Sequence, residues 1–446
     1  MIHTHTNTRR ALLYQFHDIL PGSAIAWVYS EVERNYADME HKLERIIASS
    51  IEAIAGKGDK PMLANAAPLA QQGVGAAAIA VAGASPKVTA NVDDDGCVHM
   101  YNERVSFTLD KSGRIISAVD LKTGRETIDP SQPGNELQLF VDSPAEWDAW
   151  DIEKNYEQCR LDALNITGSS LGEDGVMTVD GVIGCSPFTQ TIGLDDDVDA
   201  LTIRTHIDWK ESDRLLKQAF PVKIYANEAE SEIQYGHITR PIHRNTTWDE
   251  ARFETLAHRW VHVEEGGFGV GIANMANYGN DIQPIVMDDG RPGTRIRLSL
   301  LRAPHFPAPH ADVGEHDFTV SFTVGTGVER AIEQGYRLNV PARAVQAAHE
   351  VAPFVSVEGE GVLVEAVKMA EDRSGDVIVR LYESLGSQSS AVVHTGFEWK
   401  AVSEVGLLER PCDAVRPAVA DVDTDRSQVV LHAHPFQIVT LRFTVA

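Results

Sequence analysis

One change of pattern constrains the fold of this chain more than any other feature: a helical sequence gives way to β-strand patterns near residue 58. Beyond residue 60, short runs rich in β-branched and aromatic residues alternate with clusters of Asp, Ser and Gly. Many short strands with turn residues between them are typical of antiparallel β-sandwiches. The clearest strand-like runs are 105–109, 201–207, 222–225, 377–382 and 436–443.

Residues 23–55 carry apolar side chains at helical spacing. Steps of three and four separate these residues, so they form one apolar stripe: Ile25, Val28, Val32, Tyr36, Met39, Leu43, Ile46 or Ile47, Ile51 and Ile54. We predict one long helix with Ser23 as its N-cap, ended by the Gly- and Pro-containing stretch 56–61. Residues 1–16 supply at most one short partner helix. Part of the stripe is therefore expected to be exposed or covered by another copy of the chain.

These patterns predict a mainly β protein in which a remnant of a helical bundle precedes antiparallel β-sandwich domains. We expect a helical segment over 1–58, and first strands of a small sandwich or a linker over 59–85. A large central sandwich is expected over 86–345 and a smaller C-terminal sandwich over 346–446. A strand near 61–65 is predicted to join the C-terminal strands, and 341–348 reads as a connector. No parallel α/β domain is expected.

Composition narrows the classes of partner. The 446 residues include 39 basic and 65 acidic side chains, a net charge of −26. Such a chain repels nucleic acid and anionic membranes, so neither is expected as a partner. No apolar run is long enough for a membrane span, and no signal peptide is visible. Four scattered cysteines without a CxxC pair suit a reducing compartment, and we expect a cytoplasmic protein.

Two stretches combine carboxylates with indoles. Asp, Glu and Trp are concentrated in 142–152, and 240–249 is similar, with Trp260 shortly after it. Sugars suit such surfaces, because a pyranose ring stacks on an indole while a carboxylate binds its hydroxyls. Packing between domains, with Asp accepting from the indole N–H, is the alternative, and it is favoured for any single residue.

Seventeen histidines raise the question of a metal site. No HExxH or Cys/His spacing occurs, and the pairs at 3 and 5 and at 432 and 434 supply only two ligands each. His17 stands out because Phe16 precedes it and Asp18 follows it. From the residues alone, a buried hydrogen-bonded imidazole is favoured, with a metal ligand as the alternative.

The stretch 15–23, QFHDILPGS, closely resembles the motif that closes the catalytic site of glycoside hydrolase family 38 α-mannosidases. Further motifs of that family follow in the expected order over nearly the whole chain. They lie at 135–142, 147–151, 208–221, 236–241, 245–249, 278–279, 298–304 and 435–441.

The resemblance implies a retaining enzyme whose Asp nucleophile forms a glycosyl-enzyme intermediate, and a divalent metal, usually zinc, that binds sugar hydroxyls. His17 matches the metal ligand contributed by the helical domain. Asp18 matches a neighbour that hydrogen-bonds the sugar. The α/β domain that carries the nucleophile and the other three metal ligands has no counterpart in these residues. No catalytic residue is therefore assigned here.

Three hypotheses follow. The chain is the C-terminal part of an α-mannosidase, supplying one metal ligand and the sandwich half, inactive alone and completed by a separate N-terminal α/β chain. Alternatively, it is a carbohydrate-binding or scaffolding module without catalysis. The weakest hypothesis is a glycosidase that uses Asp148 and Asp151. We expect an α-mannoside or oligosaccharide as ligand, zinc only in the complete enzyme, and association between copies of the chain.

Overall fold

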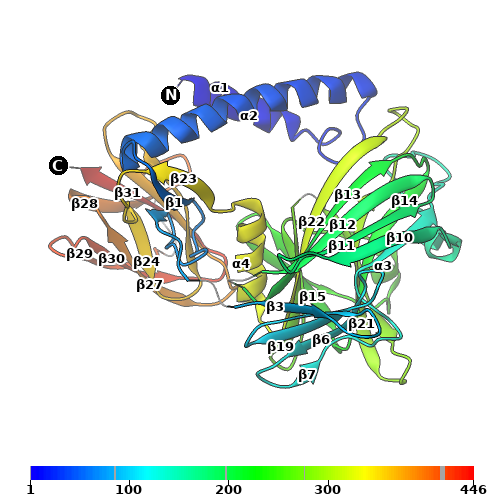
Figure 1. Cartoon of the computed structure of the whole chain (residues 1–446). Coiled ribbons are helices and arrows are strands. Elements are labelled where there is room, and N and C mark those ends of the chain that lie inside the picture. The colour runs from blue at the N-terminus through cyan, green and yellow to red at the C-terminus, as the bar shows by residue number, and fades with distance from the viewer. Residues whose placement is uncertain (1, 85–86, 196–197, 276, 412–416, 446) are drawn as a thin grey trace.

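The structure is a computed structural model that describes residues 2–84, 87–195, 198–275, 277–411 and 417–445. Two helices at the N-terminus lie across two groups of β-sheets (Figure 1). Every strand pair among the described residues is antiparallel. The prediction of a mainly β fold with antiparallel sandwiches after a helical segment is confirmed.

The first two helices are α1 (Ile2–Tyr14) and α2 (Ala26–Ala55). Tyr14, Val32 and Met39 form their shared buried cluster. The predicted N-cap is wrong: Ile25 occupies that position, with extended backbone and no side-chain cap. Ser23 instead donates from Oγ to Asp18 Oδ1 over 3.2 Å, because the preceding loop folds back on itself.

Helix α2 ends where the chain turns into the first sheet. Gly56 has a φ of 71°, a left-handed conformation that glycine adopts without steric cost. The carbonyl oxygen of Ala55 accepts hydrogen bonds from the backbone N–H groups of Ala348 and His349, both over 3.1 Å. The C-terminal end of α2 is therefore fixed to a segment almost 300 residues further along the chain.

A three-stranded sheet lies beside this helix end. Its strands, in spatial order, are β2 (Ala78–Ala80), β1 (Lys60–Asn65) and β23 (Arg343–Ala347). Two predictions are wrong here. The segment read as a connector is a strand, and β1 pairs with it rather than joining the C-terminal sandwich. The Ala-rich, half-exposed sequence of β23 conceals its strand character, which comes from its pairing with β1.

The central part is built from three sheets. The largest has nine strands in the order β10 (Leu164–Leu171), β11 (Met177–Ile183), β12 (Ser186–Leu194), β13 (Ala200–Trp209), β22 (Gly314–Val324), β19 (Phe268–Asn274), β18 (Trp260–Glu265), β15 (Glu228–Ile233), β16 (Gly236–Pro241).

The other two sheets have six and five strands. The six-stranded sheet runs in the order β17 (Thr255–Leu256), β20 (Gly279–Val286), β21 (Pro292–Leu301), β14 (Arg214–Val222), β8 (Glu136–Val141), β9 (Arg160–Leu161). The five-stranded sheet contains β3 (Thr89–Val92), β4 (Val98–Tyr101), β5 (Val105–Leu109), β6 (Ile115–Asp120), β7 (Arg125–Glu126).

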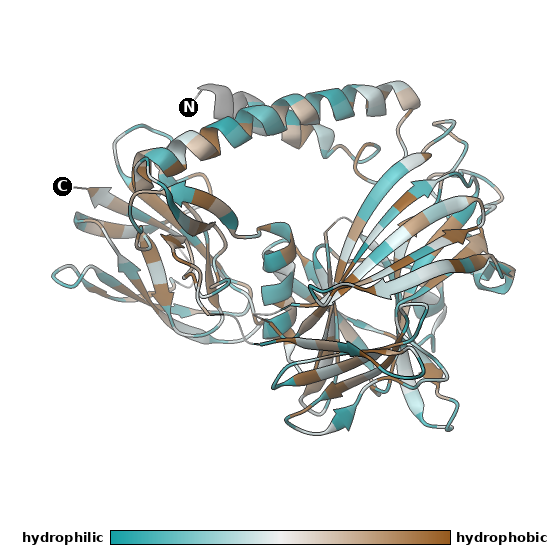
Figure 2. Cartoon of the chain, in the orientation of Figure 1, coloured by the Kyte–Doolittle hydropathy of each residue, from teal (hydrophilic) through white to brown (hydrophobic). Residues whose placement is uncertain are grey.

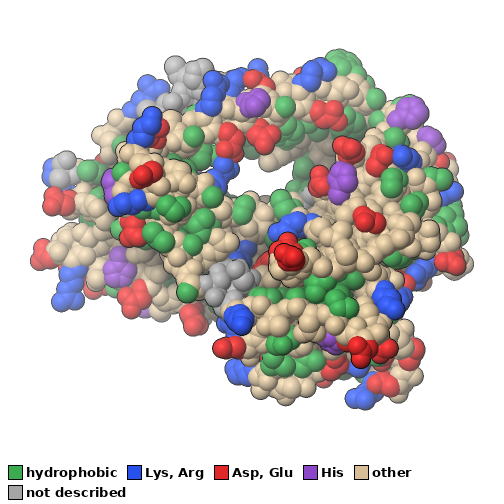
Figure 3. All heavy atoms as spheres, viewed as in Figure 1, with side chains coloured by type: hydrophobic (Ala, Val, Ile, Leu, Met, Phe, Trp, Pro, Cys, Tyr) green, Lys and Arg blue, Asp and Glu red, His purple; other side chains and the backbone are tan. Residues whose placement is uncertain are grey.

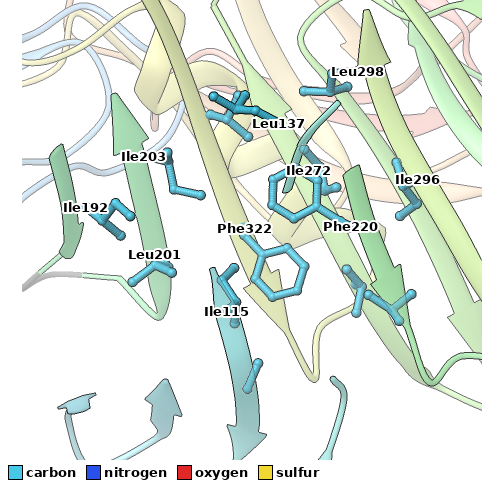
Figure 4. Close-up of a cluster of buried hydrophobic side chains, with 14 of the residues drawn as sticks. Ile115, Leu137, Ile192, Leu201, Ile203, Phe220, Ile272, Ile296, Leu298 and Phe322 are labelled. Atoms are coloured by element: carbon cyan, nitrogen blue, oxygen red, sulfur yellow. The ribbon is translucent and has the colours of Figure 1, made fainter. Parts of the chain in front are cut away.

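All three central sheets share one apolar core. The rings of Phe220 and Phe322 stack at its centre, 5.5 Å apart, and Ile115 of the five-stranded sheet points at them (Figure 4). The predicted strand at 222–225 is largely wrong, because β14 ends at Val222. The next residues leave the ladder: Lys223 donates its backbone N–H to the carbonyl oxygen of Thr127, over 2.7 Å.

The C-terminal part consists of two four-stranded sheets around a second core. One sheet contains β24 (Val355–Glu358), β27 (Ser389–Thr395), β30 (Gln428–Ala433) and β29 (Val419–Asp423). The other contains β25 (Val362–Met369), β26 (Val377–Glu383), β31 (Ile438–Val445) and β28 (Trp399–Val405). The domain boundaries given above remain predictions.

Short helices join these parts. They are the 3-10 helix η1 (Lys154–Cys159), α3 (Thr247–Ala251) and α4 (Val328–Asn339). Helix α4 lies between the central and C-terminal parts (Figure 1). Its residues Ala331, Ile332 and Tyr336 share a core with Leu363 and Tyr382 of the C-terminal sheets. The two β regions are thus joined by a third apolar cluster.

The helix pair differs from the sheets in polarity and in packing. Figure 2 shows a largely hydrophilic α2 with scattered apolar positions, above strands in which the two classes alternate. In the space-filling view, an opening passes between α2 and the two β regions (Figure 3). As predicted, part of the apolar stripe is exposed, including Tyr36, Leu43 and Ile54. In the described part of the chain, no helix combines the length and apolar character needed to cross a membrane.

Candidate functional site

The loop between α1 and α2 presents His17 and Asp18 to the surface. The His17 side chain is 79% exposed, and its Nε2 lies 3.6 Å from Asp18 Oδ2. The interpretation of His17 as a buried, hydrogen-bonded imidazole is therefore wrong. Its ring lies 4.1 Å, centroid to centroid, from that of Phe16, which is also exposed. An exposed imidazole beside a carboxylate is available to a ligand from outside the loop.

Asp18 connects this loop to the Trp-rich stretch of the central part. Trp150 donates its indole Nε1–H to Asp18 Oδ1 over 3.3 Å, across 132 residues of sequence. Trp147 packs edge-on against Trp150, with ring centroids 6.0 Å apart, and Phe306 lies 6.1 Å from Trp150. Asp18, Trp147, Trp150 and Phe306 form what we call the aromatic rim. Its three rings are 48–61% exposed.

The Trp-rich loop is held in an uncommon conformation. Trp147 has a φ of 62°, which costs a bulky residue on the order of 1–3 kcal/mol. Arg302, just beyond the end of β21, offsets this strain by donating from Nη2 to the carbonyl oxygens of Asp148, over 3.0 Å, and Asp151. Its Nε–H donates to Asp142 Oδ2 over 2.7 Å. Arg302 thus determines which way the two indoles face.

Asp142 is buried at the base of this loop. Burial raises the pKa of its carboxyl group, although the hydrogen bond and the charge of Arg302 act in the opposite direction. Its Oδ1 atom has no hydrogen-bond partner within the described residues. Asp142 therefore serves to anchor Arg302, and its side chain does not reach the exposed rim.

The donors at this loop do not fit a complete metal site. Zinc in proteins takes four donors, or three and a water. The loop offers the imidazole of His17 and the carboxylate of Asp18, which already accepts from Ser23 and Trp150. Across the described residues, no group of three or more His, Cys, Asp or Glu side chains is placed to hold a metal ion.

Beneath η1 lies a buried network of charges. Lys217, whose side chain is fully buried, donates to Asp281 Oδ2 over 2.7 Å and to Glu254 Oε2 over 2.6 Å. Arg297 binds the same aspartate through Nε and Nη2, over 2.9–3.0 Å, and Tyr156 through its hydroxyl group. Each buried charge thus has a partner of opposite sign, which such burial requires.

The network shifts the pKa of its members in opposite directions. Burial alone would lower the pKa of Lys217, but the charges of Glu254 and Asp281 raise it. Burial would raise that of Asp281, but Lys217 and Arg297 hold it below the usual range. Both groups are therefore ionised at neutral pH, and the network stiffens the sheet beneath the Trp-rich loop.

A cavity of about 380 Å³ lies at the junction of the central and C-terminal parts. Tyr278, from one of the sequence motifs, lines it together with His258, Asn277 and Glu365. The pKa of Tyr36 in α2 is raised first by burial and then by Tyr14 and Tyr278.

Part of this arrangement was predicted from the sequence. The His17–Asp18 loop and the Trp-rich stretch were each selected, and the structure brings them together. The second stretch, 240–249, forms a separate cavity with α3. Arg302 and Phe306 were missed as members of the site. Arg302 belongs to the family motif at 298–304. Its position just past the end of a strand was the one signal in the sequence that it could contribute to a site.

Comparisons with known proteins agree on one family. Residues 100–310 match the sequence profile described as the glycosyl hydrolases family 38 C-terminal domain. Residues 361–441 match the C-terminal beta sandwich domain of the same family. Residues 3–54 match the alpha mannosidase middle domain.

Individual relatives extend over almost the whole chain. Human alpha-mannosidase 2C1 is 31% identical over 97% of this chain, and alpha-mannosidase of Saccharomyces cerevisiae is 26% identical over 97%. The chain spans less than half of each relative, 44% and 42%. An alpha-mannosidase structure from Enterococcus faecalis aligns with a TM-score of 0.71 at 14% identity. That alignment covers 97% of this chain and 62% of the other, and at this identity it shows a shared fold.

Proposed function

Because this chain belongs to glycosyl hydrolase family 38, of which it contains middle and C-terminal regions, we propose that it supplies those parts of an α-mannosidase. The aromatic rim is one wall of the mannoside site. One observation carries the proposal: the hydrogen bond from Trp150 to Asp18 joins the two stretches that sequence reasoning associates with sugars.

The rim offers what a pyranose requires. The exposed indole faces of Trp147 and Trp150 pack against the C–H surface of a sugar ring, and Arg302 fixes their orientation. Asp18 accepts a hydrogen bond from a sugar hydroxyl with an oxygen not committed to Ser23 or Trp150. We assign Asp18 a substrate-binding role and no catalytic residue to this chain.

His17 is proposed as one ligand of a zinc ion whose remaining donors come from polypeptide outside these 446 residues. Bound there, zinc would act as a Lewis acid toward sugar hydroxyls. His17 alone binds zinc weakly, since one imidazole does not offset the desolvation of the ion. Its exposure supports the proposal, because a donor set contributed by an α/β catalytic domain has access to it.

The exposed apolar face of the helix pair supports docking of such a domain, or of a second copy of this chain. Leu12, Leu13, Phe16, Leu20 and Trp27 are 49–68% exposed around the candidate site. Several large apolar side chains exposed on one helix pair support an interaction surface there. The Cys97, Cys159 and Cys185 thiols are free, which supports a cytoplasmic location; Cys412 lies outside the described residues.

The test is hydrolysis of an aryl α-mannoside by the purified chain, alone and with a supplied family 38 α/β domain plus zinc. We expect no appreciable turnover by the chain alone and turnover by the pair. In the pair, H17A should lose at least a hundredfold in activity, while H41A, an exposed histidine on α2, should change it less than twofold. Robust turnover by the chain alone, abolished by H17A, would show that a complete site exists within it.

A non-catalytic carbohydrate-binding role is the second candidate, favoured by the exposure of the rim. Titration calorimetry with an α-mannoside separates the two. Binding by the chain alone that is lost in W150A and kept in W248A, without turnover in the presence of the α/β domain, supports the binding module. Zinc calorimetry tests His17 independently of activity: in the pair, H17A should weaken the binding of zinc at least tenfold.

A further inference from the structure

The stretch 240–249 forms a cavity that the proposed mannoside site does not use. It lies at an open edge of the central sandwich, between edge strand β16 of the nine-stranded sheet and edge strand β17 of the six-stranded sheet. Its volume is about 350 Å³, roughly that of ten water molecules in the liquid. Ile242, Phe253 and Pro241 line it together with polar groups. A site of this size holds a small molecule rather than a bare ion.

Arginines dominate the polar lining of this cavity. Arg240 on β16, Arg244 in the following loop and Arg252 after α3 all line it. Three arginines on one cavity are unusual for a chain of net charge −26. In an acidic chain, many carboxylates are available to pair with arginine. Several arginines that lack a close carboxylate at one place therefore suggest that an anion from outside the chain binds there.

These arginines have no carboxylate in direct hydrogen-bond contact among the described residues. The Arg252 guanidinium makes no hydrogen bond or ion pair among the described residues, and Arg240 makes one hydrogen bond, from Nη1 to the carbonyl oxygen of Leu256, over 2.9 Å. Arg244 has Glu157 as its nearest carboxylate, at 3.9 Å. Glu157 is already bound by Arg295 and Arg297.

The two carboxylates that line the cavity have other partners, although the charge of Asp249 also acts on Arg252. Asp249 accepts from the Thr246 hydroxyl over 2.7 Å in a capping box and lies 3.5 Å from His243. Asp281 is neutralised by Lys217 and Arg297 in the buried network. The cavity therefore has an excess of positive charge. The pKa of Arg240 is lowered, first by burial and then by the like charge of Arg252.

We propose that this cavity binds a phosphate monoester of sugar size, with Arg244 and Arg252 holding the phosphate group. Planar guanidinium groups bind phosphate oxygens through paired N–H donors, and two of them match a dianion. The apolar wall of Ile242 and Phe253 contacts the carbon skeleton of the ligand. The cavity is formed by elements other than those of the aromatic rim, so the site does not depend on the proposed function.

Titration calorimetry of the purified chain at constant ionic strength tests this proposal with three probes: inorganic phosphate, mannose 6-phosphate and mannose. We expect mannose 6-phosphate to bind at least tenfold more tightly than mannose. If inorganic phosphate binds as tightly as the ester, the free anion is the ligand and the phosphate site stands. If the ester binds more tightly, the carbon skeleton contributes as well. The proposal would be overturned if neither inorganic phosphate nor mannose 6-phosphate bound more tightly than mannose.

Variants locate the binding. R252Q and R244Q should each weaken mannose 6-phosphate binding at least fivefold, and R252Q breaks no side-chain hydrogen bond or ion pair among the residues that the structure describes. R291Q is the matched control, because Arg291 is 82% exposed, on a turn outside the cavity, and should change affinity less than twofold. D18N should leave phosphate affinity unchanged. Equal losses in R252Q and R291Q, or loss of binding in D18N, would contradict the assignment.

Discussion

The central sandwich and the N-terminal helix pair bury their apolar residues to very different extents. In β14, eight of nine residues are buried, whereas in the thirty residues of α2 only Val32, Met39 and Ala55 are. The sandwich encloses its own core between three sheets. The helix pair covers a thin seam and leaves Trp27, Tyr36 and Ile54 in contact with solvent.

This difference indicates that the sandwich provides stability, whereas the helix pair provides a surface for assembly. A region that completes its own core folds and persists alone, while a region with an unmatched apolar face gains most from a partner. The buried charge network also belongs to the self-contained region, since its cations and carboxylates pair with one another inside the sandwich. The His17–Asp18 loop, by contrast, presents a histidine whose proposed partners lie elsewhere.

The largest expected effect tests the claim that the sandwich is self-contained. K217M removes the cation that neutralises Glu254 and shares Asp281 with Arg297. Removing one partner of a buried ionic group typically costs about 3–5 kcal/mol. We expect a fall in melting temperature on the order of 10 °C by scanning calorimetry. K210M is the control, because the exposed Lys210–Asp208 pair should contribute less than about 1 °C. Equal shifts in the two variants would contradict the structural role of the network.

The next prediction concerns the seam of the helix pair. M39A deletes a side chain that is 3% exposed between α1 and α2, at a cost of about 2 kcal/mol. Because the seam is separate from the sandwich core, the loss should appear as faster hydrogen exchange in α1 and α2. The melting temperature of the sandwich should move by less than about 2 °C. A global fall as large as that of K217M would show that the two regions unfold as one unit.

A smaller effect is expected where the central and C-terminal regions meet. His237 on β16 lies edge-on to Phe436, with ring centroids 4.8 Å apart, and its Nε2 is 3.8 Å from Glu230 Oε1. The pKa of His237 is lowered below 6.5, first by burial, although Glu230 acts to raise it. A histidine with a lowered pKa contributes stability that is present above pH 6.5 and lost as the pH falls through the folded-state pKa.

H237Q should therefore reduce the drop in melting temperature between pH 7.5 and pH 5.5. The comparison is made within each protein, by thermal unfolding at the two values, so that the cost of the substitution itself cancels. H394Q is a suitable control, because His394 is a partly exposed histidine on β27 away from this contact. An unchanged pH dependence in H237Q would show that folding does not change the pKa of His237.

The smallest effect concerns the outer face of the helix. Glu44 of α2 binds Arg343 of β23 through two hydrogen bonds, of 2.6 and 2.8 Å, and both side chains are about half exposed. Exposed pairs contribute little and are screened by salt. E44Q should leave the melting temperature unchanged and slightly increase exchange near the end of α2 at low salt. E40Q removes an exposed acid that has no hydrogen bond or ion pair from its side chain among the described residues, and it should not increase exchange. A large loss in E44Q would mean that this pair, rather than the apolar cluster of Ala55, Met62 and Ala347, fixes the helix end.

Sequence reasoning succeeded where structure is decided locally. The helix 26–55 follows from a stripe at steps of three and four, and β5 and β26 follow from runs of β-branched and aromatic residues. It failed where contacts with distant segments determine the local structure. Lys223 leaves the ladder because its N–H finds the carbonyl oxygen of Thr127, and β23 is a strand because β1 pairs with it.

The candidate site shows the same limit. The His17–Asp18 loop and the Trp-rich loop were each identified by composition and motif. Their hydrogen bond could not be predicted, because it depends on how α2 lies across the sandwich. Arg302 was missed because its role is to donate hydrogen bonds to two loop carbonyl oxygens, which leaves no trace in side-chain spacing. The spacing of charged residues gave no indication of the Lys217 network either, since its members come from five separate segments.

The length of helix α2 also sets the distance between the two β regions at its ends. Its thirty residues span about 45 Å at 1.5 Å per residue, and both ends are fixed, one beside the Asp18–Trp150 contact and the other at Ala348 and His349. Inserting one residue in its exposed middle would turn one end by about 100° relative to the other. Even a seven-residue insertion, which nearly restores the angle, adds about 10 Å that neither anchor can absorb. The exposed face of α2 is thus free in composition while the helix is fixed in length, so side chains on that face can vary far more readily than the number of residues.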